Sequence, residues 1–267
     1  MGKNTLKNNN TEENSVPEIT QELNLWQRYR AFSAKYPLVK TTQRIIKRAV
    51  LFFFVSTIVM TFVYKFVPVW ITPTMIDRKI EAISEGNDSE IHSDWEPYEN
   101  ISKEAALAVV ASEDQLFPVH HGFDFESMWG AFLHNFKGKR IKGASTISQQ
   151  VAKNVFLWQG RSYVRKVLEV YFTVLIELIW GKERILEVYL NIAEMGKMTF
   201  GVEATALKFY GHSANSLSRS EAARIAAVLP SPNRFSIKNP SNYVVRRTNA
   251  IARQMRRLGG RSYIKGL

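Results

Sequence analysis

The sequence predicts a mainly α-helical domain that follows one membrane-spanning helix. The apolar run AVLFFFVSTIVMTFVYKFVPVWI at 49–71 carries one charge, Lys65, and is as long as a spanning helix, which needs about 20 residues. Further along, apolar residues recur at helical spacing between capping residues, and no alternating run requires a sheet. We therefore expect a tail over 1–48, disordered and then basic, a transmembrane helix over 49–71, and a globular domain over 72–267.

Charge on the two sides of the apolar run predicts its orientation. The segment 26–48 is basic and contains no Asp or Glu, whereas acidic residues follow the run between Asp77 and Asp94. The positive-inside rule then places the N-terminus in the cytoplasm and the domain outside the membrane. Lys65 lies towards one end of the run and can snorkel. A cleaved signal peptide and a buried core helix are the alternatives, and the run is too long for the first.

Composition limits the chemistry. The formal net charge of +12 indicates an anionic partner, which could be nucleic acid, a phospholipid surface or a phosphorylated substrate. Because the chain has no cysteine, disulfides and thiolate metal sites are excluded. The nucleotide-binding patterns GxxxxGK[ST] and GxGxxG are absent as well. A bond-forming reaction outside the membrane therefore needs a substrate that carries its own leaving group.

The stretch ASEDQLFPVHHGFD at 111–124 holds the first candidate for catalysis. It ends a predicted helix that Ser102 caps, and Glu113 shares a face of that helix with Val109 and Val110. A desolvated carboxyl group has a raised pKa, which suits a general base that takes a proton from a hydroxyl group. The alternative is a glutamate at a helix end in an ordinary ion pair.

An aromatic and basic segment follows. Trp129, Phe132, Leu133 and Phe136 recur at helical spacing. Four cations come directly after them, namely Lys137, Lys139, Arg140 and Lys142. Such a segment is typical of an element at the membrane surface, and the alternative is core packing beside a solvated basic loop.

The segment GASTISQQVAKN at 143–154 predicts a helix capped by Ser145 or Thr146. The helix presents Thr146, Gln150, Lys153 and Asn154 on one polar face. Together with the free N–H groups at the helix start, these side chains suit a phosphate or pyrophosphate. The alternative is a capped surface helix with a solvated polar face.

Two helices are expected over 162–195. In the first, a core stripe is predicted that Phe172 and Ile176 widen towards one edge. Its residues are Val164, Val167, Leu168, Tyr171, Leu175 and Leu178. At its edge Arg165 and Glu169 form either an ordinary helical ion pair or, with Lys166, a phosphate site that includes a second active carboxylate. The second helix, KERILEVYLNIAEM, is expected to end at Gly196.

The motifs EDQLFPVHHG, GASTISQQVAKN, RKVLE, KERILEVYLN and GVEATALKFYG occur in one order between His92 and Gly260. In this order and spacing the chain resembles the peptidoglycan glycosyltransferases, which also form a module of bifunctional penicillin-binding proteins. The SxxK, SxN and KTG triplet of a transpeptidase domain is missing, so the resemblance is to the monofunctional biosynthetic members. One departure is His212, where the family usually has Lys.

The resemblance implies a lysozyme-like fold with a membrane-facing lobe and a reaction that polymerises lipid II into β-1,4-linked glycan. The donor carbon would be inverted and undecaprenyl pyrophosphate released. By the family's pattern Glu113 deprotonates the acceptor hydroxyl, and Glu169 assists the departing pyrophosphate. The location implied is the inner membrane of a bacterium, with the domain in the periplasm.

The resemblance also implies which residues bind the substrate. They are Asp114, Ser145, Thr146, Gln149, Gln150, Lys153, Asn154, Arg165 and Lys166. No cofactor is expected to be required, although Mg²⁺ or Mn²⁺ could assist, and no resident metal site is assigned. Expected partners are lipid II, the growing glycan chain and membrane lipids, with proteins of cell-wall synthesis or division as further candidates and nucleic acid excluded.

Two other function classes fit some of the same features. A lysozyme-like hydrolase or lytic transglycosylase also uses paired carboxylates. However, a hydrolase of uncharged glycan has no use for a phosphate-type cluster at Thr146, Lys153 and Arg165. A cationic membrane scaffold or nucleic-acid binder would use the basic C-terminal helix and would not need Glu113.

Overall fold

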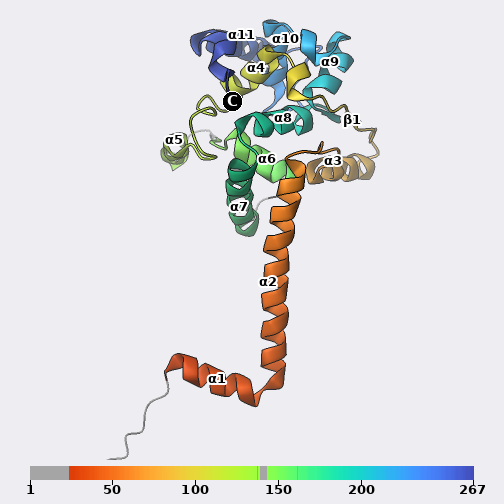
Figure 1. The fold of residues 1–267 in the computed structure, drawn as a ribbon. Helices are drawn as coiled ribbons and strands as arrows, with labels where there is room; N and C mark the ends of the chain where they lie inside the picture. The colour runs from red at the N-terminus through yellow and green to blue at the C-terminus, as the bar shows by residue number, and fades with distance from the viewer. Residues whose placement is uncertain (1–23, 137, 139–142, 161) are drawn as a thin grey trace, which may run out of the picture. The chain divides into compact units, whose positions relative to one another are not determined.

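The computed structural model describes residues 24–136, 138, 143–160 and 162–267. These form two compact units, Met1–Val55 and Ser56–Leu267, which are taken one at a time (Figure 1). Residues 1–23, for which a disordered tail is predicted, lie outside the described residues. The same holds for the four cations predicted to follow the aromatic segment, at 137, 139, 140 and 142.

The N-terminal unit consists of helix α1 (Leu25–Lys35) and the first part of helix α2 (Pro37–Tyr64). A capping box starts α1, because Asn24 Oδ1 accepts from the Gln27 N–H and Gln27 Oε1 accepts from the Asn24 N–H, both at 2.9 Å. The chain leaves the helix at Tyr36, which precedes Pro37 and has extended backbone angles.

Helix α2 is long and apolar enough over Leu38–Tyr64 to cross a membrane. It is displaced from the predicted 49–71, since it starts earlier and ends at Tyr64. The last residues of the apolar run, 65–71, form a turn and extended chain instead. Pro68 explains the early end, because it has no N–H to donate to the Tyr64 carbonyl four residues earlier and its ring would clash with that group in a helix.

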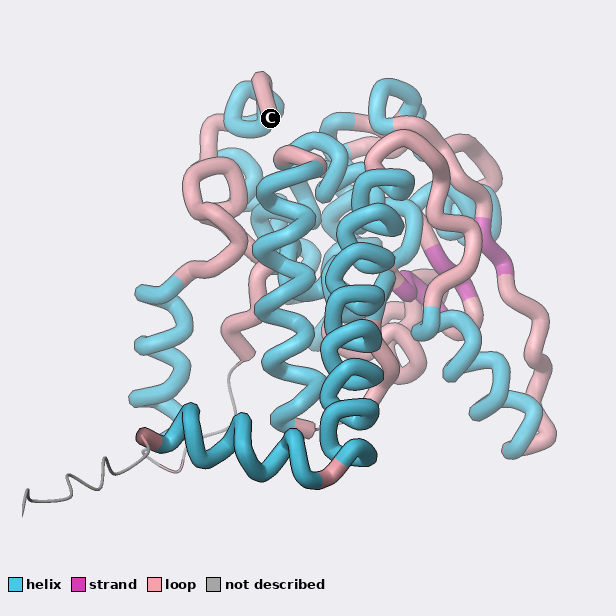
Figure 2. Tube along the Cα trace, turned by 60° about the horizontal axis from the view of Figure 1, so that its bottom comes forward, coloured by secondary structure: helices cyan, strands magenta, loops and turns pink. Residues whose placement is uncertain are grey.

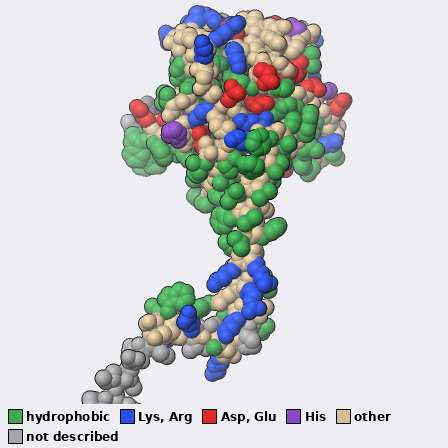
Figure 3. Space-filling view, in the orientation of Figure 1, with side chains coloured by type: hydrophobic (Ala, Val, Ile, Leu, Met, Phe, Trp, Pro, Cys, Tyr) green, Lys and Arg blue, Asp and Glu red, His purple; other side chains and the backbone are tan. Residues whose placement is uncertain are grey.

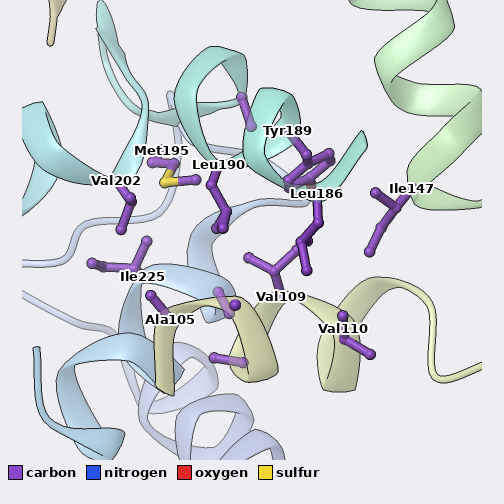
Figure 4. Close-up of a cluster of buried hydrophobic side chains, with 14 of the residues drawn as sticks. Ala105, Val109, Val110, Ile147, Leu186, Tyr189, Leu190, Met195, Val202 and Ile225 are labelled. Atoms are coloured by element: carbon purple, nitrogen blue, oxygen red, sulfur yellow. The ribbon is translucent and has the colours of Figure 1, made fainter. Parts of the chain in front are cut away.

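The core of the second unit is built around helix α4 (Lys103–Glu113). Its small residues let α10 (Arg219–Val228), α11 (Asn242–Arg257) and the 3₁₀ helix at 260–264 pack closely around it, and α8 (Lys182–Ile192) adds buried side chains to the same core. Figure 4 shows Val109 of α4 beside Leu186 and Leu190 of α8, and Ala105 of the same helix beside Ile225 of α10. The predicted helix that Ser102 caps is confirmed, and Glu113 is its last residue.

A second group of helices contains α3 (Pro73–Ser84), α6 (Ile147–Phe156) and α7 (Tyr163–Ile179). Helix α6 packs against both α7 and α8, so it joins this group to the core. The end of α2 is fixed here too, since Trp180 Nε1 donates to the Thr61 carbonyl at 2.7 Å. Helix α5 (Phe125–Phe136) buries only Ala131 among the side chains described for it.

The core stripe predicted for α7 is confirmed in part. Leu168, Tyr171 and Leu175 are partly buried against the core, and Phe172 and Ile176, expected at the edge of the stripe, are fully buried. The other three residues of the stripe are not covered. Val164, Val167 and Leu178 are 67%, 69% and 78% exposed. The buried residues are Glu169, Phe172, Thr173 and Ile176, which lie on the neighbouring face. The reason is that α6 packs on the Phe172 side, where Phe156 stacks on the Phe172 ring at 4.4 Å. The part of the stripe formed by Val164, Val167 and Leu178 is therefore left uncovered.

Helix α5 also has an uncovered apolar face. Trp129, Phe132, Leu133 and Phe136 are all exposed, so the core-packing alternative for this segment is wrong. Figure 3 shows hydrophobic side chains gathered around α5 and over the lower part of the second unit. An apolar surface of this kind indicates contact with a membrane or a partner.

Strands are few and short, as Figure 2 shows. They are β1 (His92–Ser93), β2 (Glu194–Gly196) and β3 (Thr199–Phe200), in the order β1-β3-β2. The predicted end of α8 at Gly196 is wrong, because the helix ends at Ile192 and Glu194–Gly196 pairs with β3. Helix α9 (Val202–Tyr210) follows, and the short 3₁₀ helices are 98–100, 214–216 and 260–264. The mainly helical fold is confirmed.

Candidate active site

Glu113 ends α4 in contact with two distant helices. Gln150 Nε2 of α6 donates to Glu113 Oε2 at 3.2 Å, and Arg247 Nη2 of α11 lies 3.5 Å from Glu113 Oε1. Burial raises the pKa of the Glu113 carboxyl group, and the contacts with Gln150 and Arg247 oppose that rise. The carboxylate is thus desolvated yet held by two donors, as a general base requires.

A pocket of about 800 Å³ opens beside this carboxylate. Its lining includes Glu113, Asp114, Ser145, Thr146, Gln150 and Arg247. Two more carboxylates, Asp124 and Glu126, line the same pocket, so carboxylates outnumber cations among the described residues of its lining. Hydroxyl groups of a sugar suit such a lining, because each can donate to a carboxylate.

Asp114 fixes the distance between α4 and α6. Its buried carboxylate accepts from the Ile147 N–H at 2.9 Å and lies 2.9 Å from His120 Nε2. The Ile147 N–H belongs to the first turn of α6, where negative charge is favoured. Asp114 therefore holds the end of α4 against the start of α6, and this brings Glu113 within reach of Gln150.

Tyr189 of α8 fixes the orientation of the Gln150 amide. The buried Tyr189 hydroxyl donates to Gln150 Oε1 at 3.3 Å, which leaves Gln150 Nε2 to face Glu113. Burial, and then the charge of Glu113, raise the pKa of the Tyr189 hydroxyl well above its usual value, so it stays a donor. Tyr189 acts on Glu113 through Gln150 and is a positioning residue.

We expect Tyr189→Phe to lower kcat about 2–10-fold, the loss that corresponds to one hydrogen bond. Because Gln150 then holds Glu113 less firmly, the pKa of Glu113 should rise and the acidic limb of the pH–rate profile should move to higher pH. Tyr210→Phe is the control, since the buried Tyr210 hydroxyl has no hydrogen-bond partner among the described residues. A Tyr189→Phe variant with an unchanged pH profile would contradict this role.

Arg247 was not predicted from the sequence as a site residue. We expect Arg247→Ala to raise the pKa of Glu113 further, because the guanidinium favours the charged carboxylate. A base works when deprotonated, so activity should fall near neutral pH and recover at higher pH. Arg247→Lys should retain most of the effect, and Arg246→Ala, on the exposed side of α11, should change nothing. The measurement is the pH dependence of kcat/KM for the four proteins.

A cationic cluster surrounds Glu169 on α7. Arg165 Nη1 lies 3.2 Å from Glu169 Oε2, and Lys166 Nζ lies 2.5 Å from Glu169 Oε1. Lys153 of α6 belongs to the same cluster. Burial lowers the pKa of its ammonium group, the charge of Glu169 raises this pKa and the charge of Arg165 lowers it, so both side chains interact with Lys153. Arg165 Nε is buried and has no hydrogen-bond partner within the described part of the chain. Three cations around one carboxylate leave positive charge for an anion.

Helix α6 connects the pocket to the cationic cluster. Gln150 faces Glu113, and Lys153 follows three residues later, about 4.5 Å further along the helix axis. The pocket lining does not include Glu169 or Lys153, so the two predicted carboxylates stand in separate surroundings. A substrate that reaches both would carry its hydroxyl groups and its phosphates at opposite ends.

The remaining predicted residues have other contacts. Thr146 caps α6 and donates to the Gly122 carbonyl at 2.7 Å, and Gln149 Oε1 accepts from the Thr146 N–H at 3.0 Å. Asn154 Oδ1 accepts from Thr74 at 3.3 Å. Capping and packing thus occupy Gln149 and Asn154, while Ser145 lines the pocket. A role of these residues in substrate binding stays a prediction.

The sequence of this chain matches the family model described as "Transglycosylase" over residues 78–256. A biosynthetic peptidoglycan transglycosylase of Pseudomonas putida is 50% identical over 230 residues, which cover 86% of this chain and 98% of the relative. The protein of the same name from Chromohalobacter salexigens is 50% identical over 224 residues, 84% of this chain and 96% of the relative. The matched region contains the whole site described above, and the chain belongs to the transglycosylase family.

Proposed function

We propose that this chain, a peptidoglycan glycosyltransferase by its family and relatives, polymerises lipid II with Glu113 as the general base. The observation that carries the proposal is the desolvated Glu113 carboxylate, held by Gln150 and Arg247 at the edge of a pocket that suits sugar hydroxyls. A lytic transglycosylase is not supported, because the relatives that this chain matches over nearly their whole length are biosynthetic transglycosylases.

In the proposed reaction Glu113 takes the proton of the acceptor 4-hydroxyl group. The acceptor oxygen then forms a bond to the anomeric carbon of the donor while the bond from that carbon to the pyrophosphate oxygen breaks. Attack on the face opposite the leaving group inverts the carbon and gives a β-linkage from the α-linked donor. The proton on Glu113 passes to solvent before the next cycle, so the base is regenerated.

The leaving pyrophosphate is assigned to the cationic cluster. Lys153, Arg165 and Lys166 would stabilise the negative charge that develops on it. The buried Arg165 Nε–H, unpartnered within the described residues, would donate to a phosphate oxygen. Glu169 would hold Arg165 and Lys166 in place, since each of its carboxylate oxygens accepts from one of them.

A divalent cation enters no step of this proposal. Among the described residues no three His, Asp or Glu side chains form a group that could hold one. Glu169 is a poor ligand here, because both of its oxygens already contact cationic side chains. Phosphate charge in this site is instead balanced by Lys and Arg.

Membrane attachment follows from two surfaces. Helix α2 is compatible with an anchor by length and composition, and we propose that its basic N-terminal side faces the cytoplasm. The exposed apolar faces of α5 and α7 would enter the outer leaflet of the inner membrane and meet the lipid-linked substrate there. Partners from cell-wall synthesis or division are proposed without assigned residues.

The direct experiment incubates the detergent-solubilised chain with labelled lipid II and, separately, with purified peptidoglycan sacculi. We expect lysozyme-sensitive polymer from lipid II and no soluble fragments from sacculi. Release of muropeptides from sacculi without polymer from lipid II would overturn the proposal and favour a lytic enzyme.

A further inference from the structure

Helix α1 carries an apolar face made mostly of aromatic side chains. At 100° per residue the apolar side chains fill an arc of about 120° on a helical projection. They are Leu25, Trp26, Tyr29, Phe32 and, at the C-cap, Tyr36. All five are exposed, from 43% for Tyr29 to 87% for Leu25. The Phe32 and Tyr36 rings lie 4.7 Å apart, so the face continues to the end of the helix.

Cations border this face on both sides. On the same projection Arg28 and Lys35 lie at one border and Arg30 at the other, while Gln27 and Ala34 lie opposite. The chain contains no Asp or Glu from Leu23 to Ile76. A helix with an apolar face between cations and with no acidic residue is complementary to an anionic surface that has an apolar layer beneath its charged groups.

The residues described for the N-terminal unit do not bury this face of α1. None of its described residues is buried, so α1 has no core of its own to pack against. A helix of 11 residues is marginal in water by itself. A surface that binds its aromatic face is therefore the expected source of its stability.

The position of α1 in the chain indicates which surface this is. Helix α2 has 28 residues and at 1.5 Å per residue is about 42 Å long, close to the ~40–45 Å of a bilayer with its headgroup layers. If α2 crosses the membrane, its first residue, Pro37, lies at headgroup level, and α1 ends only two residues before it. The first turns of α2 add further cations, among them Lys40, Arg44 and Lys47.

We propose that α1 is an interfacial helix that binds the anionic phospholipids of the leaflet from which α2 enters the membrane. Trp26, Tyr29 and Phe32 insert at the level of the headgroups, where aromatic rings are favoured. Arg28 and Lys35 bind lipid phosphates at the border of the inserted face. The helix would fix the N-terminal end of α2 at the membrane surface independently of the catalytic site.

The absence of cysteine allows a direct test, because a single introduced cysteine is the only site that a thiol-reactive fluorophore can label. The variants are Phe32→Cys within the aromatic face and Ala34→Cys opposite it, in the full chain reconstituted into vesicles of phosphatidylcholine and phosphatidylglycerol. We expect the label at position 32 to react with an aqueous reductant at least about fivefold more slowly than the label at 34. Equal rates at the two positions would overturn the proposal and leave a protein as the partner of this face.

A second comparison tests the anionic headgroups. Each cation that meets an anionic lipid strengthens binding about fivefold. In vesicles of phosphatidylcholine alone, or with Arg28→Gln and Lys35→Gln combined, the rates at the two labelled positions should therefore approach one another. An undiminished difference in phosphatidylcholine alone would overturn the assignment to anionic lipid. Polymer formation from lipid II by the labelled chains reports the proposed function separately, since none of these residues lies in the site.

Discussion

Glu113→Gln is expected to lower the rate of polymer formation from lipid II by about 10²–10⁴, the contribution of a general base. The amide is nearly the same size as the carboxylate, and its oxygen can accept from either Arg247 or Gln150, but it cannot accept the proton of the acceptor hydroxyl. Gel analysis of labelled products should show polymer from the wild type and almost none from the variant at equal protein concentration.

The thermal stability of the Glu113→Gln variant distinguishes a loss of catalysis from misfolding. Burial raises the pKa of Glu113 above its unfolded value, so the protonated form is favoured by folding. The contribution of Glu113 to stability therefore decreases as pH rises from its unfolded pKa through its folded pKa. At neutral pH Glu113→Gln should unfold at the same temperature as the wild type or higher. Glu126→Gln, in the same pocket, is the matched control and should remain active; wild-type rates from Glu113→Gln would remove Glu113 as the base.

Gly201→Ala is expected to cause the largest loss of stability among the glycine-to-alanine substitutions in this protein. Gly201 has φ +83° and ψ 157°, a region that only glycine adopts readily, at a cost of about 1–3 kcal/mol for other residues. A Cβ there would also lie 2.6 Å from the Asn191 carbonyl oxygen at the end of α8, an overlap worth about 1–3 kcal/mol more. Backbone atoms form this contact, so no side-chain rotation relieves it.

Gly211→Ala is the matched control. Gly211 also has positive φ, at +76°, but no heavy atom lies within 4 Å of its added Cβ. Its substitution should therefore cost only the left-handed backbone energy of about 1–2 kcal/mol. Thermal unfolding in detergent should show a decrease in Tm for Gly201→Ala at least about twice that for Gly211→Ala. Equal decreases would mean that the contact with Asn191 relaxes on substitution.

Local sequence predicted several elements because the forces that define them are local. Ser102 before α4 and Thr146 before α6 mark helix starts, since each satisfies an N–H group within the first turn. Glu113 was found for the same reason, as its place on an apolar helix indicated desolvation without knowledge of the neighbours. The cluster of Arg165, Lys166 and Glu169 lies within one turn and a half of a single helix.

What the sequence by itself determined is therefore the helical class, several helix starts and the apolar run, and it singled out Glu113 and Glu169 as candidate carboxylates. The tertiary structure alone decided that Tyr189 and Arg247 meet Gln150 and Glu113, that Glu194–Gly196 leaves α8 to pair with β3, and which face of α7 is covered. Periodicity identifies the residues that share a face, but it does not identify what packs on that face. On α7 the difference is decisive, because Val164, Val167 and Leu178 stay exposed while Glu169 is buried among cations.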